Sequence, residues 1–255
     1  MQYSFASDMA ESGVHFALAP NTVFRWFQVL GERGSGTNVV RKTIFLNAKL
    51  LRTEGMGWKH GFPMMVAVPS HFIAVAVVRD AEAWAISMHK RPWHLSPLAQ
   101  HRGFSDFIRA PWEGIIDRPE DFSIMHPELV TGSEGRALQL DRHPITGKPF
   151  ENLFALRRAK LAALVGLLER DISVVLVRME SVVNAPQLFM ERFRTTTCVA
   201  AKRDFWRAPN RRMGNNFSRS VPIPPTPKEM PEVDRAFMRS ELDLDLEAAL
   251  GYRYD

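Results

Sequence analysis

The fold is decided by the stretch RWFQVL, residues 25–30, which runs directly into GERGSGTN, residues 31–38. The first part is a short apolar run of the kind that forms a buried strand, and the second is a glycine-rich turn. Beyond the turn, apolar residues recur at roughly helical spacing: Val39, Val40, Ile44, Leu46, Leu50 and Leu51. We therefore predict a strand, a turn and a helix in direct succession.

Two more runs predict strands, HFIAVAVVR at residues 71–79 and ISVVLVR at 172–178. The first is apolar throughout, as is typical of a strand buried on both faces of a parallel sheet. Asp80 follows it at the position of a helix N-cap, before a helical pattern that reaches about Lys90. A weaker run at residues 195–200 is interpreted as a fourth strand.

Helical patterns separate these strands. The expected helices cover residues 150–169, a segment that opens with Pro186, and residues 231–250. Strands that alternate with helices predict a mainly parallel sheet flanked by helices. We expect a single three-layer α/β domain over residues 1–255, with two irregular parts: an aromatic-rich insertion at 91–149 and an extended surface segment at 207–231.

Composition excludes several classes of protein. The chain has 255 residues, of which 45% are hydrophobic and 24% charged, so we expect a folded protein. The single cysteine, Cys198, excludes a disulfide framework and a multi-cysteine zinc module, and its apolar surroundings predict a buried thiol. The histidine spacing fits no recognised metal motif, and we assign no metal. We expect a cytoplasmic protein without a membrane span or a secretory signal.

The net charge of +5 favours an anionic partner. No run of five or six basic residues is present, so we expect no nucleic-acid partner and interpret the excess as room for a small polyanion. A nucleic-acid-binding protein that uses the basic surface remains a less favoured alternative.

The glycine-rich turn at residues 31–38 has the features of an anion site, because its backbone N–H groups and the helix N-terminus both favour negative charge. Gly31 and Gly36 have the spacing of the nucleoside-triphosphatase loop. Thr37 and Asn38, however, stand where that loop has its lysine and its Mg²⁺-binding hydroxyl. This difference argues against ATP or GTP hydrolysis. Considered alone, the stretch is equally compatible with a plain glycine turn.

Four segments together resemble the sulfotransferases that use 3′-phosphoadenosine 5′-phosphosulfate. Ser35-Gly36-Thr37-Asn38 matches the core of that family's first loop, and Arg79 is followed eight residues later by Ser87, as in its second motif. The segment from Val177 to Pro186 is similar to a late strand-and-turn motif of the family, and residues 250–252 resemble its C-termini.

The resemblance implies a P-loop-like fold and a nucleotide sulfuryl donor, with no metal. Gly34, Ser35, Gly36, Thr37 and Asn38 would hold the phosphosulfate. Arg79 and Ser87 would hold the 3′-phosphate, and the insertion at 91–149 would lie on the side of a small-molecule or carbohydrate acceptor.

Catalysis needs a base for the acceptor's proton and positive charge on the leaving phosphate. Family members usually have Lys or Arg where this chain has Gly34. The candidate substitutes for that missing charge are Arg33, Lys59 and Arg41. For the base we expect His60, with Glu54 as the alternative.

Two other functions remain open within the same fold. One is a nucleotide-binding module that has lost catalysis at Gly34. The other is a P-loop phosphotransferase, which would bind ATP together with Mg²⁺. The identity of the acceptor and the oligomeric state are not determined by the sequence.

Overall fold

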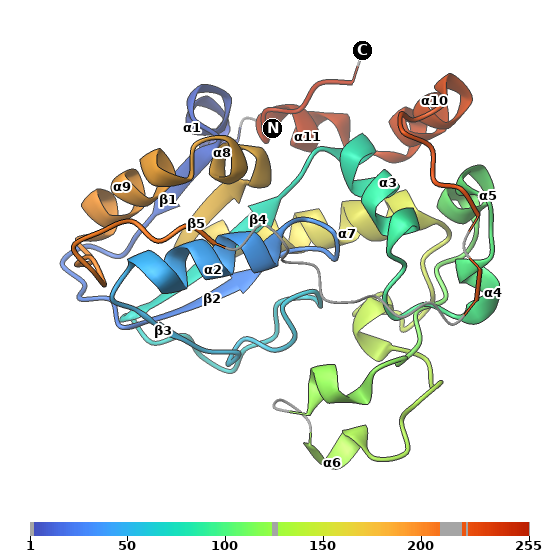
Figure 1. The fold of residues 1–255 in the computed structure, drawn as a ribbon, viewed down its shortest axis with the longest axis horizontal. Helices are drawn as coiled ribbons and strands as arrows, with labels where there is room; N and C mark the ends of the chain where they lie inside the picture. The colour runs from blue at the N-terminus through green and yellow to red at the C-terminus, as the bar shows by residue number, and fades with distance from the viewer. Residues whose placement is uncertain (1–2, 124–126, 210–220, 223, 255) are drawn as a thin grey trace.

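A five-stranded sheet forms the centre of the protein (Figure 1). The computed structural model describes residues 3–123, 127–209, 221–222 and 224–254. The strands lie in the order β1-β5-β4-β2-β3, with bounds β1 (Val14–Ala17), β2 (Trp26–Leu30), β3 (Leu51–Arg52), β4 (Phe72–Val78) and β5 (Ser173–Arg178). All neighbouring strands are parallel except β1, which pairs antiparallel with β5. The predictions of an α/β fold and of a mainly parallel sheet are confirmed.

Strand β4 is buried along its whole length, and its side chains alternate between two cores. Ala74, Ala76 and Val78 belong to one core, with residues of the helices α1 (Ala6–Glu11), α7 (Leu153–Val165) and α11 (Leu244–Ala249). Ile73, Val75 and Val77 belong to the other, with residues of the helices α2 (Thr37–Asn47), α8 (Met179–Asn184) and α9 (Pro186–Thr197). Helices therefore cover both faces of the sheet.

The remaining helices lie beyond the carboxyl end of the parallel strands. They are α3 (Ala81–Lys90), α4 (Pro97–Gln100), α5 (Phe104–Arg109), α6 (Pro127–Val130) and α10 (Glu232–Glu241), with the 3₁₀ turns η1 (Pro119–Phe122) and η2 (Gln139–Asp141). A third 3₁₀ turn, η3 (Gly166–Glu169), connects α7 to the start of β5. α3, α5, the first part of α7 and α10 share a third core around Trp84 and Phe154. The green segment that carries α6 projects away from the sheet in Figure 1. No helix among the described residues is long and apolar enough to cross a membrane.

The connections that follow β2 and β4 lie on opposite faces of the sheet. The connection from β2 to β3 passes through α2 on one face of the sheet, whereas the connection from β4 to β5 passes through α7 on the other. Because β2 and β4 are neighbouring parallel strands, the position between their carboxyl ends is a topological switch point. Ligands of open α/β sheets bind outside the carboxyl ends of the strands at such a point. We therefore expect a ligand-binding site in the crevice at this switch point.

The strands expected at residues 25–30, 71–79 and 172–178 are present as β2, β4 and β5. Asp80 caps α3, since its side chain accepts a hydrogen bond from the Ala83 amide. The prediction of a strand at residues 195–200 is wrong, because the helix α9 continues to Thr197. The buried residues of α9 are three and four apart (Phe189, Met190, Phe193 and Thr197), which is a helical period.

The expectation of a buried Cys198 is also wrong. It directly follows α9 with a positive φ of 54°, at the helix C-terminus, and its side chain is exposed. The segment expected as one helix at residues 231–250 forms two, α10 and α11, because the chain is extended at Leu242.

The buried stripe of α9 leads to a first prediction. Phe193 is fully buried, and we expect Phe193→Ala to lower the free energy of unfolding by about 3–5 kcal/mol, since it leaves a cavity in the core. Leu188→Ala, in the same helix but 65% exposed, is the control and should cost less than about 1 kcal/mol. Urea unfolding measures both, and equal losses would contradict this account of the core.

Candidate functional site

The loop between β2 and α2 carries an unusual run of backbone conformations. Gly34 and Gly36 have φ values of +75° and +86°, which favour glycine. Gly36 also needs to lack a side chain, because a Cβ there would lie 2.4 Å from Cγ of Met179. Ser35 and Thr37 are buried, whereas Gly34, Gly36 and Asn38 are partly exposed. The loop therefore presents mainly its backbone to the surface.

The amides that begin α2 are available to an anion. Within the described parts of the chain, the N–H groups of Gly36, Thr37 and Asn38 have no hydrogen-bond acceptor. Unpaired amides at a helix N-terminus, together with the helix dipole, favour a negatively charged group. The Ser35 hydroxyl, expected to be a ligand, donates instead to the carbonyl oxygen of Glu32 at 2.7 Å. It can accept a hydrogen bond but has no free proton to give.

Arg79 and Ser87 both reach this loop. Arg79 follows β4, and its Nη1 donates to the carbonyl oxygen of Gly34 at 2.7 Å. Ser87 lies in α3, and a Cβ on Gly34 would be 3.4 Å from its hydroxyl oxygen. The sequence places these residues 45 and 53 positions after Gly34, and the fold brings them together at the switch point.

Arg79 lacks the partner that a purely structural arginine would have. Among the described residues, no carboxylate lies within 4.0 Å of its guanidinium, and its buried Nε has no hydrogen-bond partner. Burial lowers the pKa of Arg79, and the charges of Glu180 and Asp80 oppose that shift. The side chain is thus a partly desolvated cation without an ion pair.

The other two segments singled out in the sequence, residues 177–186 and 250–252, lie at the same edge of the sheet. Met179, the first residue of α8, covers Gly36. Glu180 accepts hydrogen bonds from the Asp80 amide at 3.1 Å and from the Tyr252 hydroxyl at 2.8 Å. Gly251 accepts one from Nη1 of Arg178 at 3.1 Å. All four segments singled out in the sequence therefore lie around the carboxyl ends of β2, β4 and β5.

Lys59 is next to the loop on its other side. Its Nζ donates to Oδ1 of Asn38 at 2.8 Å, so the ammonium group lies at the first turn of α2. Burial, and after it the positive charge of Arg41, lowers the pKa of Lys59 to about 8. At neutral pH Lys59 is still mostly protonated and can place positive charge beside an anion on the loop.

His60 is held by the backbone of the loop. Its Nδ1 lies 2.7 Å from the carbonyl oxygen of Gly31, which fixes Nδ1 as the donor and leaves Nε2 as the acceptor in the neutral ring. Burial keeps the pKa of His60 well below 6.5, with Lys59 as a second cause. The ring is therefore neutral at physiological pH and is a weak base. Glu54, the alternative base, lies 3.8 Å from Arg41 and 3.6 Å from Arg52.

Arg33 points away from the open side of the loop. It is buried, forms an ion pair with Asp141 and donates to the carbonyl oxygen of Trp93 at 2.8 Å. Its guanidinium lies against the rings of Trp58 and Trp112, 5.6 and 5.3 Å from their centroids. A catalytic role for Arg33 requires these contacts to break, so Lys59 is better placed to act on a bound anion.

A buried ion-pair network supports the loop between β2 and α2. Arg157 of α7, which is completely buried, bonds Glu32 in the loop at 3.1 Å and Glu247 of α11 at 2.7 Å. Its Nη2 also donates to the carbonyl oxygen of Arg79 at 2.8 Å. Burial raises the pKa of Glu32 to about 7 despite the attraction of Arg157, and the negative charge of Glu247 acts in the same direction as burial. One arginine thus connects both loops of the crevice.

Asp141 is the centre of a second set of buried ion pairs, next to the network of Arg157. Asp141 accepts from Lys160 at 2.5 Å and from the Trp112 ring N–H at 2.9 Å, in addition to its ion pair with Arg33. These cations hold the pKa of Asp141 far below its usual range. Sequence reasoning missed the whole network. The available signal was the position of Arg157 and Lys160 on the apolar stripe of α7, where a charged side chain has to be paired.

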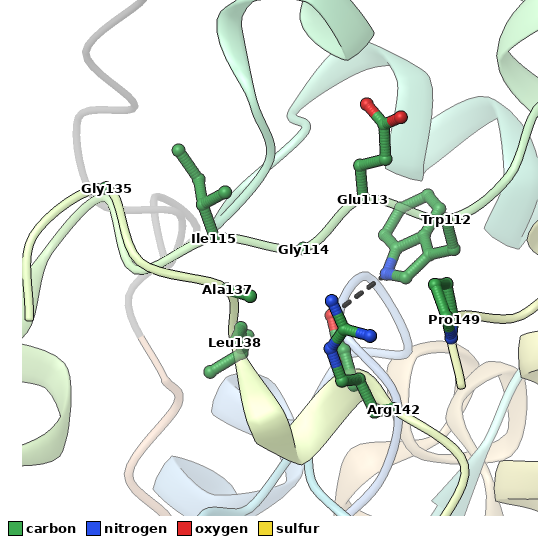
Figure 2. Close-up of a pocket in the computed structure, with 10 residues that line it drawn as sticks. Trp112, Glu113, Gly114, Ile115, Gly135, Ala137, Leu138, Arg142 and Pro149 are labelled. Carbon is green, nitrogen blue, oxygen red and sulfur yellow. Dashed lines mark hydrogen bonds between the residues drawn. The ribbon is translucent and has the colours of Figure 1, made fainter. Parts of the chain in front are cut away.

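The insertion at 91–149 contains a cavity of about 260 Å³, and Asp141 is one of the residues that line it (Figure 2). It is lined by Trp112, Glu113, Gly114, Ile115, Gly135, Ala137, Leu138, Asp141, Arg142 and Pro149. Figure 2 shows the hydrogen bond from the Trp112 ring at one wall. Trp112, an aromatic residue of the insertion, therefore lines a cavity, and it is also one of the two tryptophans whose rings lie against Arg33.

Comparison with known proteins adds no assignment: no family model, curated protein or solved structure matches this chain. Among the described residues, no group of three or more His, Cys, Asp or Glu side chains is arranged to hold a metal ion. The site is therefore interpreted from its own geometry.

Breaking the ion-pair network should destabilise the fold strongly. Arg157→Met removes the shared cation and leaves Glu32 and Glu247 buried without a partner, so we expect the free energy of unfolding to fall by about 3–5 kcal/mol. Arg158→Met, the neighbouring exposed position, should cost less than about 1 kcal/mol. Guanidinium unfolding compares the two, and a small loss at Arg157 would show that the network is dispensable.

Proposed function

We propose that the protein is a sulfotransferase that transfers a sulfuryl group from 3′-phosphoadenosine 5′-phosphosulfate to a hydroxyl or amine acceptor. The observation that carries the proposal is the meeting of Arg79 and Ser87 with the loop at Gly34. A donor with anionic groups at both ends needs two anion sites a short distance apart. The amides at residues 36–38 supply one, and the unpaired guanidinium of Arg79 with the Ser87 hydroxyl supplies the other.

The residues around the loop suggest how transfer would proceed. The acceptor oxygen or nitrogen attacks sulfur and forms the new bond to it, while the bond between sulfur and the phosphate oxygen breaks. The electron pair of that bond leaves with 3′-phosphoadenosine 5′-phosphate, whose new charge Lys59 stabilises. Nε2 of His60 takes the acceptor's proton. Its lowered pKa makes it a weak base, which suits a late proton transfer from an acceptor atom that is already bonded to sulfur.

A second candidate is a nucleotide-binding module of the same fold. It is favoured by Gly34, which leaves the loop without the basic residue usual in the family, and by the inward position of Arg33. Mass spectrometry of an acceptor panel incubated with the donor separates the candidates. Sulfated product supports the enzyme, whereas tight nucleotide binding without product supports the module.

Nucleotide binding should depend on Arg79. We expect 3′-phosphoadenosine 5′-phosphate to bind more tightly than ATP, and Arg79→Ala to weaken the bisphosphate about tenfold or more, because a charge-assisted hydrogen bond is worth roughly 1.5–3 kcal/mol. Calorimetry with and without Mg²⁺ measures this. Arg91→Ala, an exposed arginine after α3, is the control.

Arg79 also binds the loop, so Ser87→Ala provides an independent test of the same subsite. It should weaken the bisphosphate by a smaller factor while leaving the melting temperature unchanged. The donor assignment is wrong if ATP binds as well as the bisphosphate and neither substitution matters.

Lys59 should make binding of the nucleotide pH-dependent. Its pKa of about 8 means that the ammonium group is lost as the pH rises from 7 to 9.5. Calorimetry over this range should show the affinity for 3′-phosphoadenosine 5′-phosphate falling several-fold in the wild type. Lys59→Arg keeps its charge and should show a flat profile, and Lys59→Met should be weak at every pH. A wild-type profile that is flat would exclude Lys59 from the anion site.

A further inference from the structure

Cations also lie on the other side of the loop from Arg79, and we propose that they bind an anionic group carried by the acceptor. This β3-side cluster consists of Arg41 on α2, Arg52 at the end of β3, and Glu54 and Lys59 in the segment that follows. β2 lies between β4 and β3 in the sheet. The loop after β2 therefore has Arg79 on one side and the β3-side cluster on the other. The inference rests on the proposed function.

The cluster has more positive than negative charge. Nη1 of Arg41 and Nε of Arg52 lie 3.8 and 3.6 Å from the same oxygen atom of Glu54, beyond hydrogen-bond distance. Lys59 bonds a neutral amide oxygen, and no carboxylate of the described residues lies within 4.0 Å of its Nζ. The cluster therefore contains three cations and one carboxylate, which gives it a net charge of +2 near the N-terminus of α2.

These cations repel one another in partly desolvated positions. The side chains of Arg41 and Arg52 are 28% and 41% exposed. Burial lowers the pKa of Arg41 and the charge of Arg52 lowers it further, while Lys59 is affected by Arg41 in the same way. Asp121 also acts on Lys59, but its carboxylate is already engaged by Arg118 and by His94 at 3.2 Å. A bound anion would relieve this repulsion.

The donor accounts for Lys59 in the cluster but not for Arg41 or Arg52. Its phosphosulfate is assigned to the amides at residues 36–38, and its 3′-phosphate to Arg79 and Ser87 on the β4 side. An anion bound by Arg41 and Arg52 would therefore come with the acceptor, as a carboxylate, sulfate or phosphate ester near the group that is sulfated. Such an acceptor would be oriented by the cluster, with Lys59 between its charge and the loop.

Inorganic sulfate serves as the probe, on protein saturated with 3′-phosphoadenosine 5′-phosphate. The measurement is the rise in melting temperature in sodium sulfate over sodium chloride at equal ionic strength. We expect the double variant Arg41→Gln/Arg52→Gln to lose at least half of the wild-type rise. Arg25→Gln/Lys49→Gln removes the same charge from exposed positions at the amino end of the sheet and should retain the rise. Glu54→Gln removes the only carboxylate and should increase it.

The outcomes also separate this inference from the proposed function. Both double variants should bind the bisphosphate within threefold of the wild type, because the donor is assigned to the amides at residues 36–38, Lys59, Arg79 and Ser87 and not to Arg41. Equal sulfate responses in the two doubles, or no wild-type response, would overturn the anion site. If the bisphosphate does not bind the wild type, the proposed function and the assignment to an acceptor both fail. Repeating the sulfate series on nucleotide-free protein then shows whether the cluster still binds an anion.

Discussion

The site depends on one buried arginine. Arg157 is completely buried, and it binds carboxylates from the loop after β2 and from α11, together with the backbone carbonyl that follows β4. Burying such charges is costly and does not by itself stabilise a protein more than apolar packing would. The network fixes instead where the two loops stand relative to each other. That separation determines which anion can reach both Arg79 and the amides of α2.

The order of the strands explains why this position becomes a site. β2 and β4 send their connections to opposite faces of the sheet, so their carboxyl ends form a topological switch point, where open α/β sheets bind ligands. Gly34 allows the loop to approach α3 closely, since its φ is positive and Ser87 lies within contact distance. A longer residue at position 34 would be strained there. The glycine at position 34 is thus consistent with the tight packing of this loop.

Much of the fold could be predicted from the sequence because its central strands are continuous apolar runs bounded by glycine or by a capping residue. β1 and β3 could not, since the first is a short edge strand with mixed polarity and the second has only two residues. In the site, the local motifs of residues 35–38 and Arg79 were visible. The partners of Arg33, Arg157 and Lys160 were not, because they come from segments as far away as Glu247, and spacing along the chain carries no information about such pairs.

The contact between Glu32 and Glu247 through Arg157 has a consequence for folding during synthesis. The glycine loop leaves the ribosome early, but its supporting charge network is complete only when α11 has been made, some 215 residues later. Until then Arg157 has only one of its two carboxylate partners, and the sheet has to assemble with the network incomplete. A nascent chain of this protein is therefore expected to acquire its central strands well before it acquires affinity for any anion.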